Sequence, residues 1–167
     1  MQELSKTKKM TIAALLIAFY VVLMLSTQSF AFGQYQIRLA TAIYALSAIF
    51  PFLVLPLGFA NFLSNTLMGG LGPLDMIGGA VVGILTCSTI VWGKKKGFAN
   101  FFIALAIIFI PGLIVPIWLS IILNIPYLIL ATGLLIGQII PGIVGAVLVS
   151  ALEKQGYIKM VLEKGRR

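Results

Sequence analysis

The stretch P-L-D-M-I-G-G-A-V-V-G-I-L-T-C-S-T-I-V-W-G-K-K-K, residues 73–96, decides the class of fold. Its first part, 73–92, is apolar apart from Asp75 and a few hydroxyl-bearing side chains. A run of about 20 such residues is long enough to cross a bilayer. The three lysines at 94–96 follow at once, and a basic cluster at a helix end is typical of the cytoplasmic side. The stretch therefore predicts a membrane-spanning helix that ends in the cytoplasm.

The composition of the whole chain agrees with this prediction. Of its 167 residues, 60% are hydrophobic and 10% are charged, and the mean hydropathy is +1.11. Such a chain has too little polar surface to be soluble. The formal net charge of +8 comes from basic residues beside apolar runs, where they orient helices and contact lipid headgroups. We predict a multi-pass protein of the lipid bilayer, with no nucleic-acid partner.

Apolar runs and helix breakers predict five further helices. Pro51, Pro56 and Gly58 divide the run 39–68, which is too long for one span and short for two. If the basic N-terminus and the lysines at 94–96 both face the cytoplasm, an even number of spans separates them, and four satisfies this. We predict an all-α, compact bundle of six transmembrane helices in one domain, 1–167, with both termini cytoplasmic. The expected helices are 10–29, 39–55, 57–68, 73–92, 99–123 and 127–152.

Two charged residues stand apart from the rest. Fourteen of the sixteen charged side chains fall in the clusters 3–9, 94–96 and 153–167, which leaves Arg38 and Asp75. The predicted topology places both at outer helix ends, beside the polar, uncharged loop 27–37. Ionisable groups beside membrane segments are candidates for function. Arg38 and Asp75 either pair with each other or contact a ligand, and the two interpretations are compatible. The loop would then form a lid over a binding pocket.

Several chemistries are excluded by residues that the sequence lacks. There is no histidine, so neither Cys87 nor any serine has an imidazole base, and Asp75 has no second carboxylate for an aspartyl dyad. The glycine-rich segment 69–75 lacks the lysine and Ser/Thr of a phosphate-binding loop. We predict no catalytic residue, no metal site and no cofactor in this chain, which is therefore not an enzyme. A transporter built from it would take energy from an ion gradient or, as the lack of mid-helix carboxylates favours, from another subunit.

Uncharged polar and aromatic residues inside the apolar runs are candidates for the same pocket. Asn61, Asn65 and Gln138 either bond across the bundle or contact a ligand, and Tyr44 and Trp118 either pack in the bundle or cover a ligand ring. The repeats Gly79-x-x-x-Gly83 and Gly133-x-x-x-Gly137 favour close helix packing. Ala14 and Ala18, one turn apart, form a flat strip suited to contact with a partner helix.

At this level of detail the sequence resembles the QueT family. The resemblance rests on Q-I-R-L-A-T-A-I at 36–43, Pro51 and Pro56, Asn65, and G-L-G-P-L-D-M-I-G-G at 70–79. Arg38 falls on the arginine of that family's R-x-S-E-A-L pattern, and Asp75 on the aspartate of its G-L-G-x-x-D pattern. These proteins are substrate-binding S components of energy-coupling factor (ECF) transporters and are associated with queuosine precursors.

The resemblance implies a six-helix S component in the bacterial cytoplasmic membrane, with an outward-facing pocket beneath the first loop. Ala14 and Ala18 would dock on a transmembrane T subunit, which binds two ATPase subunits, so that ATP is used by the partners. Together, the resemblance and the residue patterns nominate eight substrate-binding residues: Arg38, Asp75, Thr41, Asn65, Gln138, Gln34, Tyr44 and Trp118.

Two positions depart from the family pattern. Thr41 and Gln138 stand where the family has glutamates, so counter-charges for a cationic aminomethyl substituent are missing. The substrate would then be a neutral or larger 7-deazapurine, or a compound outside that class. Asp75 suits a guanine-like edge, because one carboxylate accepts both the ring N–H and an amine hydrogen, while Arg38 donates to a carbonyl. The alternatives are a self-sufficient small carrier or channel, and a membrane assembly subunit that does not transport.

Overall fold

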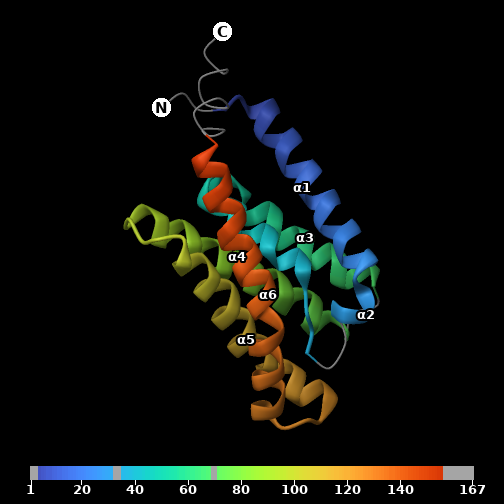
Figure 1. The fold of residues 1–167 in the computed structure, drawn as a ribbon. Helices are drawn as coiled ribbons and strands as arrows, with labels where there is room; N and C mark the ends of the chain where they lie inside the picture. The colour runs from blue at the N-terminus through green and yellow to red at the C-terminus, as the bar shows by residue number, and fades with distance from the viewer. Residues whose placement is uncertain (1–3, 32–34, 69–70, 156–167) are drawn as a thin grey trace.

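The computed structural model describes residues 4–31, 35–68 and 71–155, and this part of the chain is helical without any strand (Figure 1). The prediction of an all-α protein is confirmed. The α-helices are α1 (Lys6–Ser26), α2 (Gln28–Ala31), α3 (Val54–Leu67), α4 (Pro73–Lys95), α5 (Phe101–Leu123) and α6 (Tyr127–Lys154). Two 3₁₀ helices precede α3, namely η1 (Leu39–Ala48) and η2 (Pro51–Leu53).

Four of these helices are long and apolar enough to cross a membrane: α1, α4, α5 and α6. Two shorter apolar helical segments, Leu39–Ala48 and Pro51–Leu67, lie between α1 and α4 in the chain. The fold is thus that of a multi-pass membrane protein. Six full crossings and cytoplasmic termini stay predictions. Part of the predicted lid, Gln28–Ala31, is the short helix α2, whereas Gln34 lies outside the described residues.

The break inside the run 39–68 lies earlier than predicted. We expected helices at 39–55 and 57–68, but the chain turns at Ile49 and Phe50, and the following helical segment runs from Pro51 to Leu67. Pro51 is the first residue of η2, and Pro56 lies in the first turn of α3. The N–H groups of a first helical turn have no intrahelical acceptor, so proline costs nothing there. The two prolines begin helices here rather than ending one.

The α-helix predicted over 39–55 is also wrong in type. Its first part is η1, a 3₁₀ helix of ten residues, although such helices rarely exceed three or four. Seven of the ten residues are buried, and η1 contacts α6, α4, α1 and α5. Alanines at 40, 42, 45 and 48 keep it slender enough for the middle of the bundle.

Glycines on α4 and α6 let neighbouring backbone approach closely, as predicted. A Cβ on Gly137 would overlap the carbonyl oxygen of Tyr35, so the chain just before η1 lies directly on α6. On α4, Gly83 lies against the Cα of Gly58 in α3, and Gly79 leaves room for the side chains of Asn61 and Asn65. These glycines work inside the bundle, where they bring η1, α3, α4 and α6 together.

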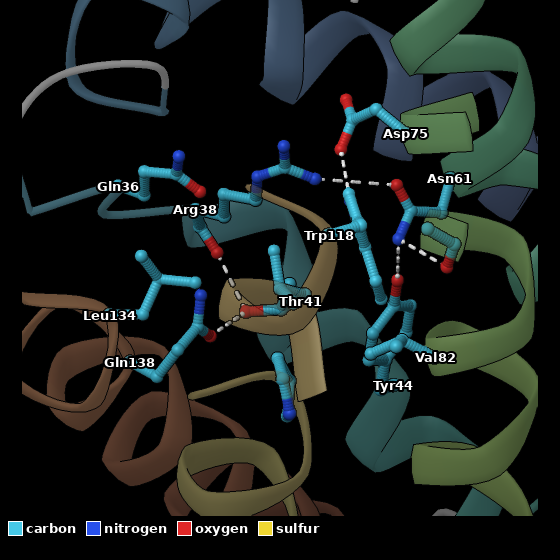
Figure 2. Close-up of a pocket in the computed structure, with 13 residues that line it drawn as sticks. Gln36, Arg38, Thr41, Tyr44, Asn61, Asp75, Val82, Trp118, Leu134 and Gln138 are labelled. Carbon is cyan, nitrogen blue, oxygen red and sulfur yellow. Dashed lines mark hydrogen bonds between the residues drawn. The ribbon is translucent and has the colours of Figure 1, made fainter. Parts of the chain in front are cut away.

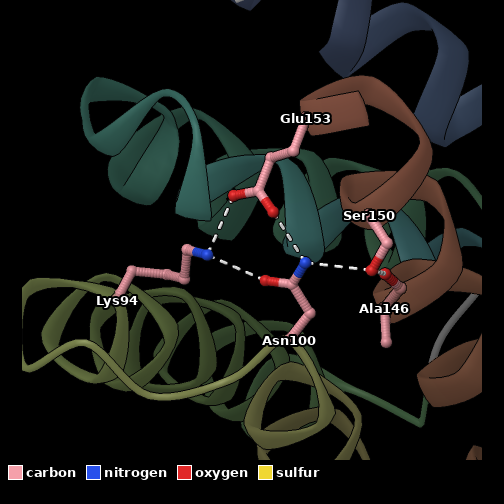
Figure 3. Close-up of polar contacts among 5 residues, drawn as sticks. All are labelled: Lys94, Asn100, Ala146, Ser150 and Glu153. Carbon is pink, nitrogen blue, oxygen red and sulfur yellow. Dashed lines mark hydrogen bonds and ion pairs between the residues drawn. The ribbon is translucent and has the colours of Figure 1, made fainter. Parts of the chain in front are cut away.

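A polar cluster joins the far end of α4 to the end of α6 (Figure 3). Lys94 Nζ lies 2.9 Å from Glu153 Oε1 and donates to Asn100 Oδ1 at 2.8 Å. Asn100 Nδ2 donates to Glu153 Oε2 at 2.7 Å and to Ser150 Oγ at 2.9 Å. The lysine loop and the end of α6 therefore lie at the same end of the bundle, as the parity argument requires.

The packing of Gly137 gives a test of this architecture. Gly137→Ala would force α6 away from the segment that leads into η1, and overpacking of this kind typically costs about 1–3 kcal/mol. We expect a lower apparent melting temperature in detergent for this variant. Thr132→Ala, on the exposed face of the same helix, serves as control and should change little. Equal stability of both variants would contradict the close contact.

Candidate functional site

A buried pocket lies where η1 meets α3, α4, α5 and α6 (Figure 2). One part of its wall is polar and another is apolar. Figure 2 shows Asp75 and Trp118 on one side of the pocket and Thr41 and Gln138 on the other, with Arg38 reaching between them. The lining residues are Gln36, Arg38, Thr41, Tyr44, Asn61, Asp75, Gly79, Val82, Pro111, Val115, Trp118, Leu134 and Gln138.

The 3₁₀ geometry of η1 explains how one short segment supplies three lining side chains. Residues three apart eclipse each other in a 3₁₀ helix, so Arg38, Thr41, Tyr44 and Ser47 form one polar row. In an α-helix, which has 3.6 residues per turn, these four residues would spread over about 180° around the axis, and some would point at apolar neighbours. Thr41 Oγ1 and Ser47 Oγ each donate to the carbonyl three residues back, both at 2.7 Å. These bonds reinforce the 3₁₀ pattern.

Asp75 is 2% exposed, and its carboxylate accepts hydrogen bonds on both oxygens. Trp118 Nε1 donates to Oδ1 at 3.1 Å, and Asn65 Nδ2 donates to Oδ2 at 3.3 Å. Asp75 also lies in the first turn of α4, where the helix dipole favours a negative charge. Each carboxylate oxygen has a second lone pair, so the group can still accept from a ligand.

Arg38 is 7% exposed and donates from Nη1 towards Asn65 Oδ1 at 3.3 Å and Asn61 Oδ1 at 3.5 Å. Asn65 therefore bridges the two isolated charges, since its amide accepts from Arg38 and donates to Asp75. Among the described residues, that amide connects the two charges, and an ion pair joins Lys94 and Glu153 at the other end of the bundle. The sequence left open whether Arg38 and Asp75 pair with each other or contact a ligand. In the structure the two side chains are linked through Asn65.

The opposite side of the pocket is neutral. Thr41 Oγ1 contacts Gln138 Oε1 at 2.8 Å, and the two side chains are 3% and 1% exposed. Of the residues that line the pocket, Arg38 and Asp75 carry formal charges of opposite sign. The wall is therefore neutral overall, and a charged ligand would be buried without a counter-charge of its own.

The space between these side chains is small. The volume that the centre of a water molecule can occupy is about 10 Å³, which is about enough for a single water. A bicyclic heteroaromatic ligand is many times larger. Binding of such a ligand therefore requires lining side chains to move and their mutual hydrogen bonds to be exchanged.

The structure brings together most of the residues nominated from the sequence. Arg38, Thr41, Tyr44, Asp75, Trp118 and Gln138 line the pocket, and Asn65 lies behind the two charged groups. Gln34 lies outside the described residues. The strip residues Ala14 and Ala18 are exposed on α1, away from the pocket.

The eight nominated residues did not include Asn61, which the sequence offered only as a candidate, nor Gln36 and the apolar wall of Val82, Val115 and Leu134. Asn61 had a detectable signal, because it lies one helical turn before Asn65 and shares its face. Gln36 has a positive φ of 44°, which turns the chain into the pocket just before η1. The valines and the leucine are ordinary membrane-helix residues, and their sequence carries no sign of the pocket.

Comparison with known proteins gives one match. The family model described as QueT transporter matches residues 10–154, which is most of the chain. No curated protein and no solved structure matches it.

The bridging role of Asn65 can be tested by Asn65→Leu, a change of similar volume. The variant removes the bridge and leaves buried polar groups on Arg38 and Asp75 with fewer partners, at about 1–3 kcal/mol for each group left unsatisfied. We expect a clear fall in thermal stability in detergent. Thr66→Ala, on the exposed side of the same helix, is the control, and an Asn65→Leu protein as stable as this control would refute the bridge.

Proposed function

Because the chain belongs to the QueT transporter family, we propose that it is the S component of an ECF-type importer in the bacterial cytoplasmic membrane. In this role it captures a queuosine precursor or a related 7-deazapurine outside the cell. A T subunit and two ATPase subunits complete the importer, and the ATPase subunits use ATP. The observation that carries the proposal is the meeting of Asp75, Arg38 and Trp118 in one buried pocket.

The chemistry of the pocket supports a flat ligand with a polar edge. The Asp75 carboxylate can accept two N–H groups of a guanine-like edge, and the Arg38 guanidinium can donate to its carbonyl oxygen. Trp118 and Tyr44 offer aromatic faces, and Val82, Val115 and Leu134 give an apolar wall. Thr41 and Gln138 offer hydrogen bonds without charge, which favours a neutral substituent at that end.

The closed pocket supports a capture role for the segment before η1. Tyr35 and Gln36 lie on Gly137 of α6, and Gln36 lines the pocket. Movement of this segment would open a path to the pocket, and its return would cover a ligand. The sequence holds no phosphate-binding loop, so the energy for release into the cell is assigned to the partner subunits.

Binding measurements on the purified chain test the assignment directly. Native mass spectrometry should reveal a retained small molecule, and titration calorimetry with 7-cyano-7-deazaguanine, a neutral probe, should give saturable binding without sodium or a pH gradient. Uptake of this compound into liposomes by the chain alone would contradict the proposal and favour a self-sufficient carrier.

Asp75→Asn tests the carboxylate. Hydrogen bonds to a charged group are worth about 1.5–3 kcal/mol, so the affinity for the probe should fall about 10- to 100-fold. The control is Glu153→Gln, which removes a carboxylate at the other end of the bundle and should leave affinity unchanged. An Asp75→Asn protein with full affinity would remove this residue from the binding site.

Ala14→Trp tests the docking strip on α1. The large side chain would stand on the exposed face and hold a partner helix away, so less T subunit and ATPase should copurify with the chain. Ile121→Trp, at a position of α5 that is 75% exposed, is the matched control. Normal assembly of the Ala14→Trp protein would exclude docking through this strip.

A further inference from the structure

A chain of buried hydrogen bonds runs from the pocket to α1. The rings of Tyr20 on α1 and Tyr44 on η1 are stacked, with centroids 5.7 Å apart and planes inclined by 15°. Their hydroxyl oxygens are 3.1 Å apart, and both side chains are 0% exposed. Tyr44 lines the pocket and Tyr20 does not, so this pair connects the site to a helix outside it.

At the pocket end of this series of hydrogen bonds, the orientation of the Asn61 amide is defined. Asn61 Nδ2 donates to the carbonyl of Gly79 and to the hydroxyl of Tyr44, both at 2.8 Å, which uses both of its hydrogens. The Gly79 carbonyl fixes the orientation of the amide, because an amide oxygen there would face another acceptor. Tyr44 therefore accepts from Asn61, and its hydroxyl shares a second hydrogen bond with the hydroxyl of Tyr20, in which either oxygen can be the donor. Arg38, which donates towards Asn61 Oδ1, stands at the pocket end.

Tyr20 differs from Thr11 and Ser26, two other hydroxyl-bearing side chains of α1. The hydroxyls of Thr11 and Ser26 donate to carbonyls of α1 itself. Tyr20 reaches into the bundle, and Val21 and Met24 are the other buried residues of its helix. The packing of α1 against the bundle therefore includes a hydrogen bond to Tyr44, a residue of the pocket wall.

We propose that Tyr20 is a positioning residue of the binding site, through which occupancy of the pocket changes the packing of α1 against the bundle. This inference rests on the proposed function. The pocket has room for about one water, so a ligand must replace hydrogen bonds that Arg38 and Asn61 now make within the wall. Any such exchange alters the hydrogen bond that Asn61 donates to Tyr44 and, through Tyr44, the hydrogen bond between Tyr44 and Tyr20. The exposed face of the same helix carries Ala14 and Ala18, so the coupling reaches the proposed partner surface.

The first measurement compares Tyr20→Phe with the wild type in the full chain. Loss of one hydrogen bond of about 1 kcal/mol should weaken binding of 7-cyano-7-deazaguanine about fivefold. Tyr127→Phe is the matched control, because that hydroxyl donates to the Leu113 carbonyl at 2.9 Å and lies outside the pocket lining. Its affinity should equal that of the wild type.

The second measurement separates coupling from a merely structural role. In the full chain with 3-fluorotyrosine at position 20, the ¹⁹F resonance should move by more than its linewidth when the same probe saturates the protein. With the label at position 127 it should not move. If the probe binds but the resonance at position 20 stays in place, the coupling is refuted, whatever the stability of Tyr20→Phe.

A third arm needs no ligand and so distinguishes failure of this inference from failure of the proposed function. Asn61→Leu breaks the chain at the pocket end, and Asn61→Ser does so with a smaller side chain if the first variant does not fold. Either change should move the ¹⁹F resonance at position 20 and leave that at position 127 unchanged. If the wild type binds no 7-cyano-7-deazaguanine, the proposed substrate is wrong, and this arm still decides the coupling. An unmoved resonance overturns it.

Discussion

The i to i−3 register of η1 is the constraint on which the site depends. It aligns Arg38, Thr41, Tyr44 and Ser47 on one face, in the middle of a bundle whose other central residues are mostly alanines and large apolar side chains. A 3₁₀ helix of this length has poorer hydrogen-bond geometry than an α-helix, so other interactions must stabilise it. They come from two hydroxyls that donate to the same i−3 carbonyls and from glycines of α4 and α6 that admit the segment closely.

The charges of the pocket follow from the same arrangement. A buried arginine and a buried aspartate are each costly, and in this structure an asparagine between them meets part of the cost. The bridge keeps the two groups apart, so the carboxylate and the guanidinium can be addressed by different atoms of a ligand. A direct ion pair would have hidden each behind the other. Asn65 thus allows two buried charges to stay available for recognition of a ligand. Gly79 makes room for the side chain of Asn65.

The sequence predicted the helical class, and it singled out Arg38 and Asp75, which the structure buries in the wall of one pocket, because charge placement in a membrane chain is under strong physical constraint. The 3₁₀ helix η1 was not predicted, because the polar residues 38, 41, 44 and 47 repeat every three positions only over this short segment. The prolines at 51 and 56 predict a helix break, but a first helical turn accepts proline equally well, and in the structure both lie where helices begin. The apolar wall was beyond reach, since Val82 and Leu134 differ from lipid-facing residues only in tertiary position.

The tight closure of the pocket has a consequence for selectivity. Asp75, Arg38, Asn61 and Tyr44 already make hydrogen bonds within or behind the wall, so a ligand that displaces one of these bonds must offer a replacement of matching type in a matching place. An analogue that lacks one donor leaves a buried acceptor unsatisfied, and polar sites reject such analogues far more strongly than apolar sites reject a missing methylene. Trp118 makes this concrete, because its indole N–H already bonds to Asp75 Oδ1. A ligand donor can use the second lone pair of this oxygen, whereas one that displaces the indole must give the indole N–H another acceptor. A flat heteroaromatic with N–H groups along one edge would suit Asp75, and its ring face would suit Trp118.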